Sequence, residues 1–340
     1  MEYRALGDTG LQVSEIGFGC GNTAGLLTGG AYEDQLEAVR RALDLGINYF
    51  DTAPNYGERV FYRGASEASL GKVLRELGAT PIIGTKIELH ERDLSDIPSF
   101  VARSVDESLE RLRRDTIDIL YLHNRVAAER GAEGGTGTMG GAIALSDALG
   151  ARGVLEAFTA ERGQGKVRWL GFCSSGGDPS ANRELIASDS FQVVQLSYSI
   201  LEPTEGRLPP AGYRGADHGQ TLDLAGEHGL GVVVIRVLAG GVLSGALEPH
   251  PLNTGSGVDR QYSAGAVRAR ALRFLARPGQ TMTQAAIRFA LARPRISTVL
   301  VGFSHVSQID EAAAASGAGP LPAEDLARIE RLYRNDFGRG

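Results

Sequence analysis

Four side chains suited to proton transfer follow short apolar segments in the first part of the chain. Asp51 ends an apolar, aromatic run, and Tyr56 follows it five residues later. Lys86 and His123 end two later apolar runs. A phenol has a pKa of about 10 in water, and a neighbouring ammonium lowers that pKa because it favours the phenolate. Asp51 would keep a buried lysine charged, and His123 could hydrogen-bond a substrate oxygen. The set therefore suits proton transfer to or from an oxygen whose carbon changes in the same reaction.

These residues also allow interpretations other than proton transfer. The segment 48–57 taken alone favours a strand-end aspartate that caps a turn and a surface tyrosine, because aspartate is common at such turns. Acyl transfer is less favoured, because no serine or cysteine stands beside a base in the sequence. No HExxH or similar spacing supports a zinc site, so we expect no metal. Proton transfer gains weight because polar residues also end other predicted strands.

Composition limits the class of protein. The chain has 340 residues, of which 42% are hydrophobic, and its net charge of -6 comes from interspersed charges of both signs. This balance argues against nucleic acid or an anionic membrane surface as a partner. No apolar run is long enough to span a membrane, and the charged N-terminus lacks the apolar core of a signal peptide. Cys20 and Cys173 form no CxxC motif, which suggests a reducing compartment, so we expect a cytoplasmic protein.

The elements that would position the polar side chains alternate between strand and helix patterns. Residues 2–18 alternate apolar and polar side chains around Gly7-Asp8-Thr9-Gly10, which predicts a β-hairpin that leads into a strand over 15–19. The later strands that we predict cover residues 47–50, 82–85, 117–122, 167–172, 191–196, 230–235 and 296–301. Helical spacing of apolar residues predicts helices over 36–43, 66–77 with Ser66 as its cap, 97–112, 154–162, 221–228, 267–275, 283–291, 306–315 and 323–333.

Strands that alternate with helices imply parallel strands joined by right-handed crossovers. Eight such units without a break in composition predict one α/β domain over residues 1–340, a (β/α)8 TIM barrel with an N-terminal β-hairpin and extra C-terminal helices. Active sites of such barrels lie at the C-terminal ends of the strands, where Gln195 and Arg236 would join the four residues above. We also expect two long irregular stretches at that face, 127–153 and 247–263, and expect cofactor binding to order at least the second.

The sequence resembles the aldo-keto reductase family over nearly its whole length. The matching pieces follow the family's order and are Phe50-Asp51-Thr52-Ala53 with Tyr56-Gly57, Ser66-Glu67 with Leu70-Gly71, Thr85-Lys86, Asp118-Ile119-Leu120 with His123, Leu170-Gly171, Gln195, and Val301-Gly302 with Gln308. The resemblance implies a barrel that binds an extended nicotinamide dinucleotide across its mouth. It also implies a catalytic tetrad, in which Tyr56 is the general acid, Lys86 and Asp51 tune it, and His123 positions the carbonyl.

The resemblance further implies a set of cofactor contacts, with changes at several positions. The residues implied are Cys20, Gly21, Cys173, Ser174, Gln195, Ile235, Arg236, Leu238, Gly240, Gly241, Arg260, Gly302, Ser304, Gln308 and Glu311. Cys173-Ser174 stands where the family usually has a Ser-Asn pair, and Ile235 and Arg236 replace an aromatic ring and a serine. The segment 135–140 matches the dinucleotide motif GxGxxG, but no strand pattern precedes it, so we expect a loop there.

The resemblance, together with the residues suited to proton transfer, implies an NAD(P)-dependent oxidoreductase that acts on a small aldehyde, ketone, sugar or alcohol. We favour NADP, with Arg260 contacting its 2′-phosphate and Arg236 facing the pyrophosphate, and keep NAD as the alternative cofactor. The alternative function is a cofactor-sensing regulatory subunit similar to potassium-channel β subunits, which can keep the tetrad. The inserted segment 58–65 brings Phe61 and Tyr62 near the mouth, where contact with substrate and packing of the loop are equally expected. The physiological substrate, the direction of the reaction and the oligomeric state stay open.

Overall fold

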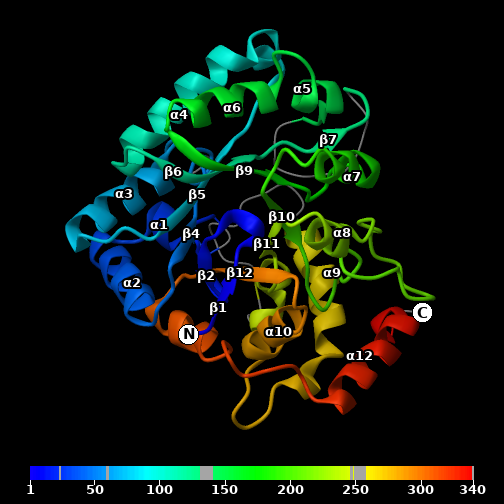
Figure 1. Ribbon diagram of the computed structural model, residues 1–340. Helices are drawn as coiled ribbons and strands as arrows, with labels where there is room; N and C mark the ends of the chain where they lie inside the picture. The colour runs from blue at the N-terminus through cyan, green and yellow to red at the C-terminus, as the bar shows by residue number, and fades with distance from the viewer. Residues whose placement is uncertain (23, 59–60, 131–140, 246–247, 249–257, 339–340) are drawn as a thin grey trace.

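The computed structural model describes residues 1–22, 24–58, 61–130, 141–245, 248 and 258–338, with residues 258–261 described by their backbone (Figure 1). Within these residues, eight parallel strands close into a barrel, which confirms the predicted fold class. In order around the barrel they are β3 (Ile16–Gly19), β4 (Tyr49–Asp51), β5 (Ile82–Ile87), β6 (Ile117–Leu122), β9 (Val167–Cys173), β10 (Val193–Ser197), β11 (Gly231–Ile235) and β12 (Ile296–Gly302), which pairs with β3.

The predicted N-terminal hairpin is present and covers the N-terminal end of the barrel. β1 (Tyr3–Ala5) pairs antiparallel with β2 (Gln12–Ser14) across a 3-10 turn at Gly7–Thr9. Leu6 is fully buried against Gly231, where a β-carbon would lie 2.6 Å from its Cδ1. The hairpin therefore blocks this end of the barrel and leaves the opposite end for a site.

Two buried tyrosines fill the barrel interior below the strand ends. The hydroxyls of Tyr49 and Tyr121 are hydrogen-bonded at 2.7 Å. The rings fit because glycines face them: a β-carbon at Gly84 would lie 2.9 Å from the Tyr121 ring, and one at Gly171 would lie 2.5 Å from it. Lys86 lies above this pair, with its Nζ 5.7 Å from the centroid of the Tyr121 ring. The tyrosine layer thus forms the floor of the C-terminal mouth.

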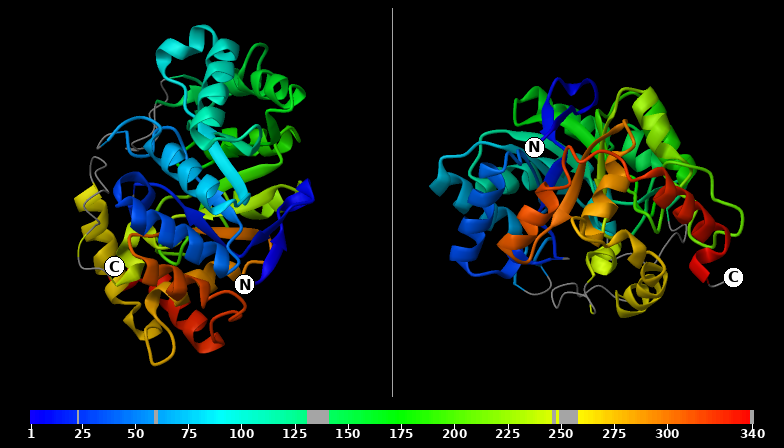
Figure 2. Two further views of the ribbon diagram at one scale, coloured as in Figure 1. Left: turned by 90° about the vertical axis from the view of Figure 1, so that its left-hand side faces the viewer. Right: turned by 90° about the horizontal axis from the view of Figure 1, so that it is seen from below.

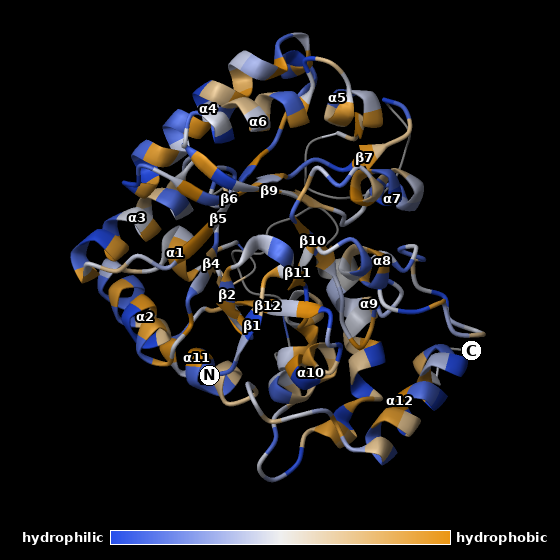
Figure 3. Cartoon of the chain, in the orientation of Figure 1, coloured by the Kyte–Doolittle hydropathy of each residue, from blue (hydrophilic) through white to orange (hydrophobic). Residues whose placement is uncertain are grey.

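Helices cover the outside of the barrel (Figures 1 and 2). α2 shows the pattern, because Ala38, Val39 and Ala42 recur at helical spacing and are buried, whereas the charged residues Glu33, Asp34, Glu37, Arg40 and Asp44 are exposed; Figure 3 shows apolar and hydrophilic residues along the same helix. The last helix before each following barrel strand is, in order, α2 (Tyr32–Asp44), α3 (Ala65–Leu77), α4 (Ile97–Leu112), α6 (Val154–Gly163), α7 (Pro179–Ala187), α8 (Thr221–Glu227) and α10 (Met282–Leu291), and α11 (Val306–Ala313) and α12 (Ala323–Arg334) follow β12. Among the described residues, none of the helices has the length and apolar composition of a membrane span.

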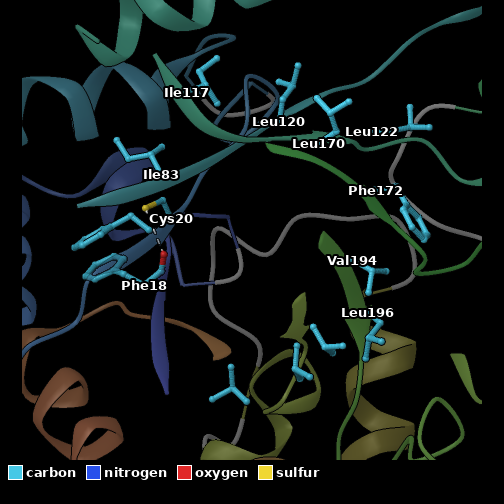
Figure 4. Close-up of a cluster of buried hydrophobic side chains, with 14 of the residues drawn as sticks. Phe18, Cys20, Ile83, Ile117, Leu120, Leu122, Leu170, Phe172, Val194 and Leu196 are labelled. Carbon is cyan, nitrogen blue, oxygen red and sulfur yellow. Dashed lines mark hydrogen bonds between the residues drawn. The ribbon is translucent and has the colours of Figure 1, made fainter. Parts of the chain in front are cut away.

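Aliphatic and aromatic side chains form the core between the strands and the helices (Figure 4). Phe18 stacks on Phe50 with ring centroids 5.2 Å apart and meets Phe303 edge to face at 4.9 Å. Truncation of such an aromatic residue to alanine typically costs about 3–5 kcal/mol. This cluster therefore holds β3, β4 and the residue after β12 in fixed relative positions.

The predictions of two long irregular stretches are wrong in part. In the first, β7 (Val126–Ala127) pairs with β8 (Ile143–Ala144), and α5 (Leu145–Leu149) follows because Asp147 accepts from the Ala144 amide at 2.9 Å. Residues 131–140, which include the GxGxxG match, lie outside the described ones.

In the second stretch, residues 258–263 are helical and belong to α9 (Val258–Arg270), whereas residues 249–257 lie outside the described ones. The helix is stabilised because Tyr262 is buried in an apolar cluster with Val242 and Leu272.

Two helix starts also differ from the prediction. α3 begins after Gly64, whose φ is 88°, and Ser66 does not cap it. The Ser66 hydroxyl instead bonds the Thr52 hydroxyl at 2.8 Å and donates to the Cys20 carbonyl at 2.9 Å, which ties together the segments after β3 and β4. α7 is not predicted at all, although Asp178 caps it by accepting from the Ser180 amide at 2.8 Å.

Candidate active site

The four residues of the expected tetrad lie together at the C-terminal end of the barrel. Asp51 is the last residue of β4, Lys86 lies near the end of β5, His123 follows β6, and Tyr56 lies in the loop between β4 and α3. Asp51, Lys86 and His123 are 3%, 1% and 6% exposed. Burial of several ionisable groups at one point shifts their pKa values and marks the cluster as the candidate site.

Asp51 and Lys86 form a buried ion pair. Nζ of Lys86 donates to both carboxylate oxygens of Asp51 at 2.6 Å and to the Thr52 carbonyl at 2.9 Å. Burial alone would lower the pKa of Lys86, but the charge of Asp51 outweighs it and raises that pKa above its usual value. Lys86 is therefore charged at neutral pH, as the sequence led us to expect.

Tyr56 keeps its proton at neutral pH. Burial raises the pKa of its phenol above the usual value, and the Lys86 ammonium, with Nζ 5.1 Å from the ring centroid, offsets only part of the rise. The expectation that Lys86 acts to lower this pKa is right in direction, but the expected net lowering is wrong because desolvation is the larger effect. The result is a neutral phenol beside a cation that would stabilise its conjugate base.

His123 is neutral at the same pH. Burial and the nearby Lys86 charge hold its pKa well below the usual value. Its ring meets the ring of Tyr56 edge to face, with centroids 6.0 Å apart, and its backbone amide donates to the Ile87 carbonyl at 2.8 Å. A neutral imidazole beside a neutral phenol can donate a hydrogen bond without adding charge to the site.

Three of the expected cofactor contacts lie beside the tetrad. Gln195 donates its side-chain amide to Asp51 and accepts from the Cys173 thiol at 3.6 Å. The Ser174 hydroxyl lies 3.3 Å from a carboxylate oxygen of Glu205. Gln195, Cys173 and Ser174 are buried, so the sequence and the fold place them together, and their contact with a cofactor stays a prediction.

Four of the expected cofactor contacts, Gly302, Ser304, Gln308 and Glu311, lie where β12 leads into α11. Oε1 of Gln308 accepts from the Ser304 amide at 2.8 Å and from the Ser304 hydroxyl at 3.2 Å, next to Gly302. Glu311 lies one turn further along α11, and its carbonyl accepts from the Gln284 side chain at 3.1 Å. Helix N-termini favour anions, so the start of α11 suits a phosphate.

The segment after β11 offers an open backbone. Ile235 ends the strand, and Arg236 and Leu238 lead into a 3-10 segment at Ala239–Ser244. Gly240 and Gly241 have φ of 72° and 100°, and the nearest atoms of the described residues, apart from the chain neighbours, would lie 3.9 Å from a β-carbon at either position. Arg260 belongs to α9, but the structure describes only its backbone and not its side chain.

Cys20 and Gly21 border the site on its other side. The Cys20 amide donates to the Asp51 carbonyl at 2.9 Å, and a β-carbon at Gly21 would lie 3.4 Å from the Tyr56 ring. The site thus has an open glycine backbone after β11, a helix N-terminus after β12 and small residues after β3, which together fit an extended dinucleotide. The described residues contain no group of three or more His, Cys, Asp and Glu side chains that could bind a metal.

Comparison with known proteins agrees with this geometry. The sequence profile of the aldo/keto reductase family matches residues 15–334. The chain belongs to the aldo/keto reductase family. The match begins after the hairpin and extends through α12, so it includes every strand of the barrel.

Relatives of this aldo/keto reductase are named as oxidoreductases. The chain is 30% identical to L-galactose dehydrogenase of Arabidopsis thaliana, over 93% of this chain and 88% of that protein. It is 27% identical to L-glyceraldehyde 3-phosphate reductase of Escherichia coli O157:H7, over 97% of this chain and 92% of that protein. The holo form of an aldo-keto reductase from Bacillus halodurans matches with a TM-score of 0.69 at 27% identity, over 98% of this chain and 96% of that one.

The structure of this aldo/keto reductase adds site residues that sequence reasoning missed. Asn55 lies beside His123 and donates to Glu88, and Glu205 lies beside Ser174. Side chains alternate along a strand, so Glu88, two residues after Lys86, falls on the same side of the chain. That spacing could have indicated Glu88, whereas Glu205 lies in the irregular segment after β10 and gave no signal.

The inserted segment of this aldo/keto reductase packs in part on the rest of the fold. A β-carbon at Gly29 would lie 2.3 Å from the Phe61 ring, so Phe61 lies against α1 (Leu26–Gly29). Phe61 and Tyr62 remain 48% and 58% exposed. Packing on α1 therefore accounts for the position of one part of the Phe61 ring. Contact of either ring with a substrate stays a prediction.

Proposed function

We propose that this protein is an NADP-dependent oxidoreductase that interconverts a carbonyl group and an alcohol on a small substrate. The observation that carries the proposal is the tetrad, in which the buried and charged Lys86 lies beside a neutral Tyr56 and a neutral, buried His123. These protonation states suit the reduction of a carbonyl, which needs a proton donor and a neutral hydrogen-bond donor at its oxygen.

The tetrad residues then have distinct roles. His123 donates a hydrogen bond that holds the carbonyl oxygen near the phenol. Nicotinamide, when bound, supplies the hydride for the carbonyl carbon. As negative charge develops on the oxygen, Tyr56 gives it the phenolic proton, and the Lys86 ammonium stabilises the phenolate that remains. Asp51 keeps Lys86 charged throughout. In the oxidative direction the same groups act in reverse.

The cofactor assignment rests on the three surfaces around the mouth. Gly240 and Gly241 would let the backbone approach the pyrophosphate, with Arg236 beside it, and Ser304 with the α11 N-terminus would hold the adenosine phosphate end. Arg260 is our candidate for contact with the 2′-phosphate, which distinguishes NADP from NAD, the second candidate cofactor.

The names of the relatives guide the choice of substrate. L-galactose and L-glyceraldehyde 3-phosphate, which appear in two of those names, are a sugar and a sugar phosphate. We therefore propose small polyhydroxylated aldehydes, ketones or lactols as the first compounds to test. Cys20 and Cys173 are free and buried, which supports our proposal of a reducing, cytoplasmic location.

Steady-state turnover with a panel of aldehydes, ketones and sugars, using NADPH and NADH separately, tests the proposal. Reduction of at least one carbonyl, faster with NADPH, is expected. Tight cofactor binding without turnover of any compound would instead favour the cofactor-sensing regulatory subunit.

A further inference from the structure

Two polar residues outside the tetrad form a chain that ends at His123. Asn55 directly precedes Tyr56 in the loop after β4, and Glu88 follows β5 and is 7% exposed. Nδ2 of Asn55 donates to Oε2 of Glu88 and also lies 3.5 Å from Nδ1 of His123. Asn55 thus joins a buried carboxylate to the imidazole.

The chemistry of the partners fixes the orientation of the Asn55 amide. A carboxylate only accepts hydrogen bonds, so the amide nitrogen, and not its oxygen, has to face Glu88. The amide oxygen is buried and has no hydrogen-bond partner among the described residues, so nothing in the structure favours the flipped orientation. One N–H of Asn55 bonds Glu88, and the same nitrogen keeps a second N–H for Nδ1 of His123.

A donor in front of Nδ1 selects one form of the imidazole. A neutral imidazole carries its proton on one nitrogen, and the other nitrogen accepts. We propose that Asn55 is a positioning residue that holds His123 with its proton on Nε2, and that Glu88 fixes the Asn55 amide for this purpose. Nε2–H is then the donor that the proposed function requires at the substrate oxygen, and the inference rests on that function for the identity of this oxygen alone.

Nitrogen-15 NMR of the histidine rings in the full chain measures the protonated nitrogen directly. With ¹⁵N-labelled histidine, and with the His123→Asn variant used to identify the signals of His123, the parent should show Nδ1 unprotonated and Nε2 protonated at neutral pH. A proton on Nδ1 of His123 in the parent would overturn the proposal. This readout needs no turnover, so it stands apart from the test of the proposed function.

Variants of the two residues test the connection. Asn55→Asp replaces the donor by an acceptor and should move the proton to Nδ1. Glu88→Leu frees the amide to turn its oxygen toward His123 and should populate the Nδ1–H form. Glu88→Gln keeps an acceptor for Asn55 and should preserve Nε2–H.

Asn335→Asp, at an exposed residue, is the matched control. The tautomer of His123 and the turnover of this variant should be those of the parent. With a substrate in hand, kcat/KM of Asn55→Asp should fall about 100-fold, the usual effect of losing one oxyanion donor. An unchanged His123 tautomer in both Asn55→Asp and Glu88→Leu would show that the amide does not set it.

Discussion

Replacement of Glu205 by glutamine tests how a buried carboxylate beside the site responds to pH. Glu205 is 1% exposed, accepts from the Thr221 hydroxyl and lies 3.3 Å from the Ser174 hydroxyl. Burial raises the pKa of Glu205 from 4.5 to about 7. Because the folded pKa lies above the unfolded one, this group's stabilisation is fully present below about pH 4.5 and is lost as the pH rises through about 7.

The size of the effect follows from the shift. One pKa unit corresponds to about 1.4 kcal/mol, so the full rise corresponds to about 3 kcal/mol of unfolding free energy. About 2 kcal/mol of this should be lost between about pH 5.5 and about pH 8.5. For a chain of 340 residues, that corresponds to roughly 3 °C in Tm. Glu205→Gln cannot ionise, and its amide offers an oxygen to one of the two hydroxyls and an N–H donor to the other, so it should lack this loss.

Reversible urea unfolding of the parent and of Glu205→Gln at these two pH values measures the difference. The matched control is Glu227→Gln, which neutralises an exposed carboxylate at the end of α8 and should keep the pH dependence of the parent. A parent and a Glu205→Gln variant whose unfolding free energies change equally with pH would refute the reasoning that burial moves this pKa toward neutrality.

Other substitutions test separate parts of the account. Lys86→Met should lower kcat by about 100- to 10,000-fold in steady-state assays, because the phenolate loses its ammonium, and retention of a tenth of the activity would contradict this role. Arg260→Ala should weaken NADP more than NAD in a binding titration, and equal weakening would rule out contact with the 2′-phosphate. Phe18→Ala should lower the unfolding free energy by about 3–5 kcal/mol, whereas Leu208→Ala, at a side chain 70% exposed, should change it little; similar losses in both would argue against the aromatic cluster as a core element.

The sequence predicts the barrel well because its strands are short apolar runs bounded by clear stops. The strand over 117–122 is found with the same limits, and Gly78 ends α3 with φ of 62°. The failures come from contacts between residues that are distant in sequence. Ser66 resembles a helix cap, but its hydroxyl is used for long-range bonds that no local pattern indicates. Helix α9 starts earlier than expected because Tyr262 is buried by residues distant in sequence.

The candidate site shows the same division. The types and order of Asp51, Tyr56, Lys86 and His123 are enough to predict that they meet at the strand ends. The net pKa shift of Tyr56 is not predictable, because it depends on how far burial exceeds the effect of Lys86. The contact of Asn55 with His123 depends on a loop conformation, so it too required the structure.

The most direct test of the proposed mechanism is the turnover of Tyr56→Phe, which removes only the phenolic oxygen. Cofactor affinity, measured by fluorescence titration, should stay close to that of the parent, because the ring remains beside Gly21. Reduction of the best carbonyl substrate should fall by about 100-fold or more, because the proton donor is gone. A variant that binds cofactor normally and turns over within about tenfold of the parent would contradict the assignment of Tyr56 as the general acid.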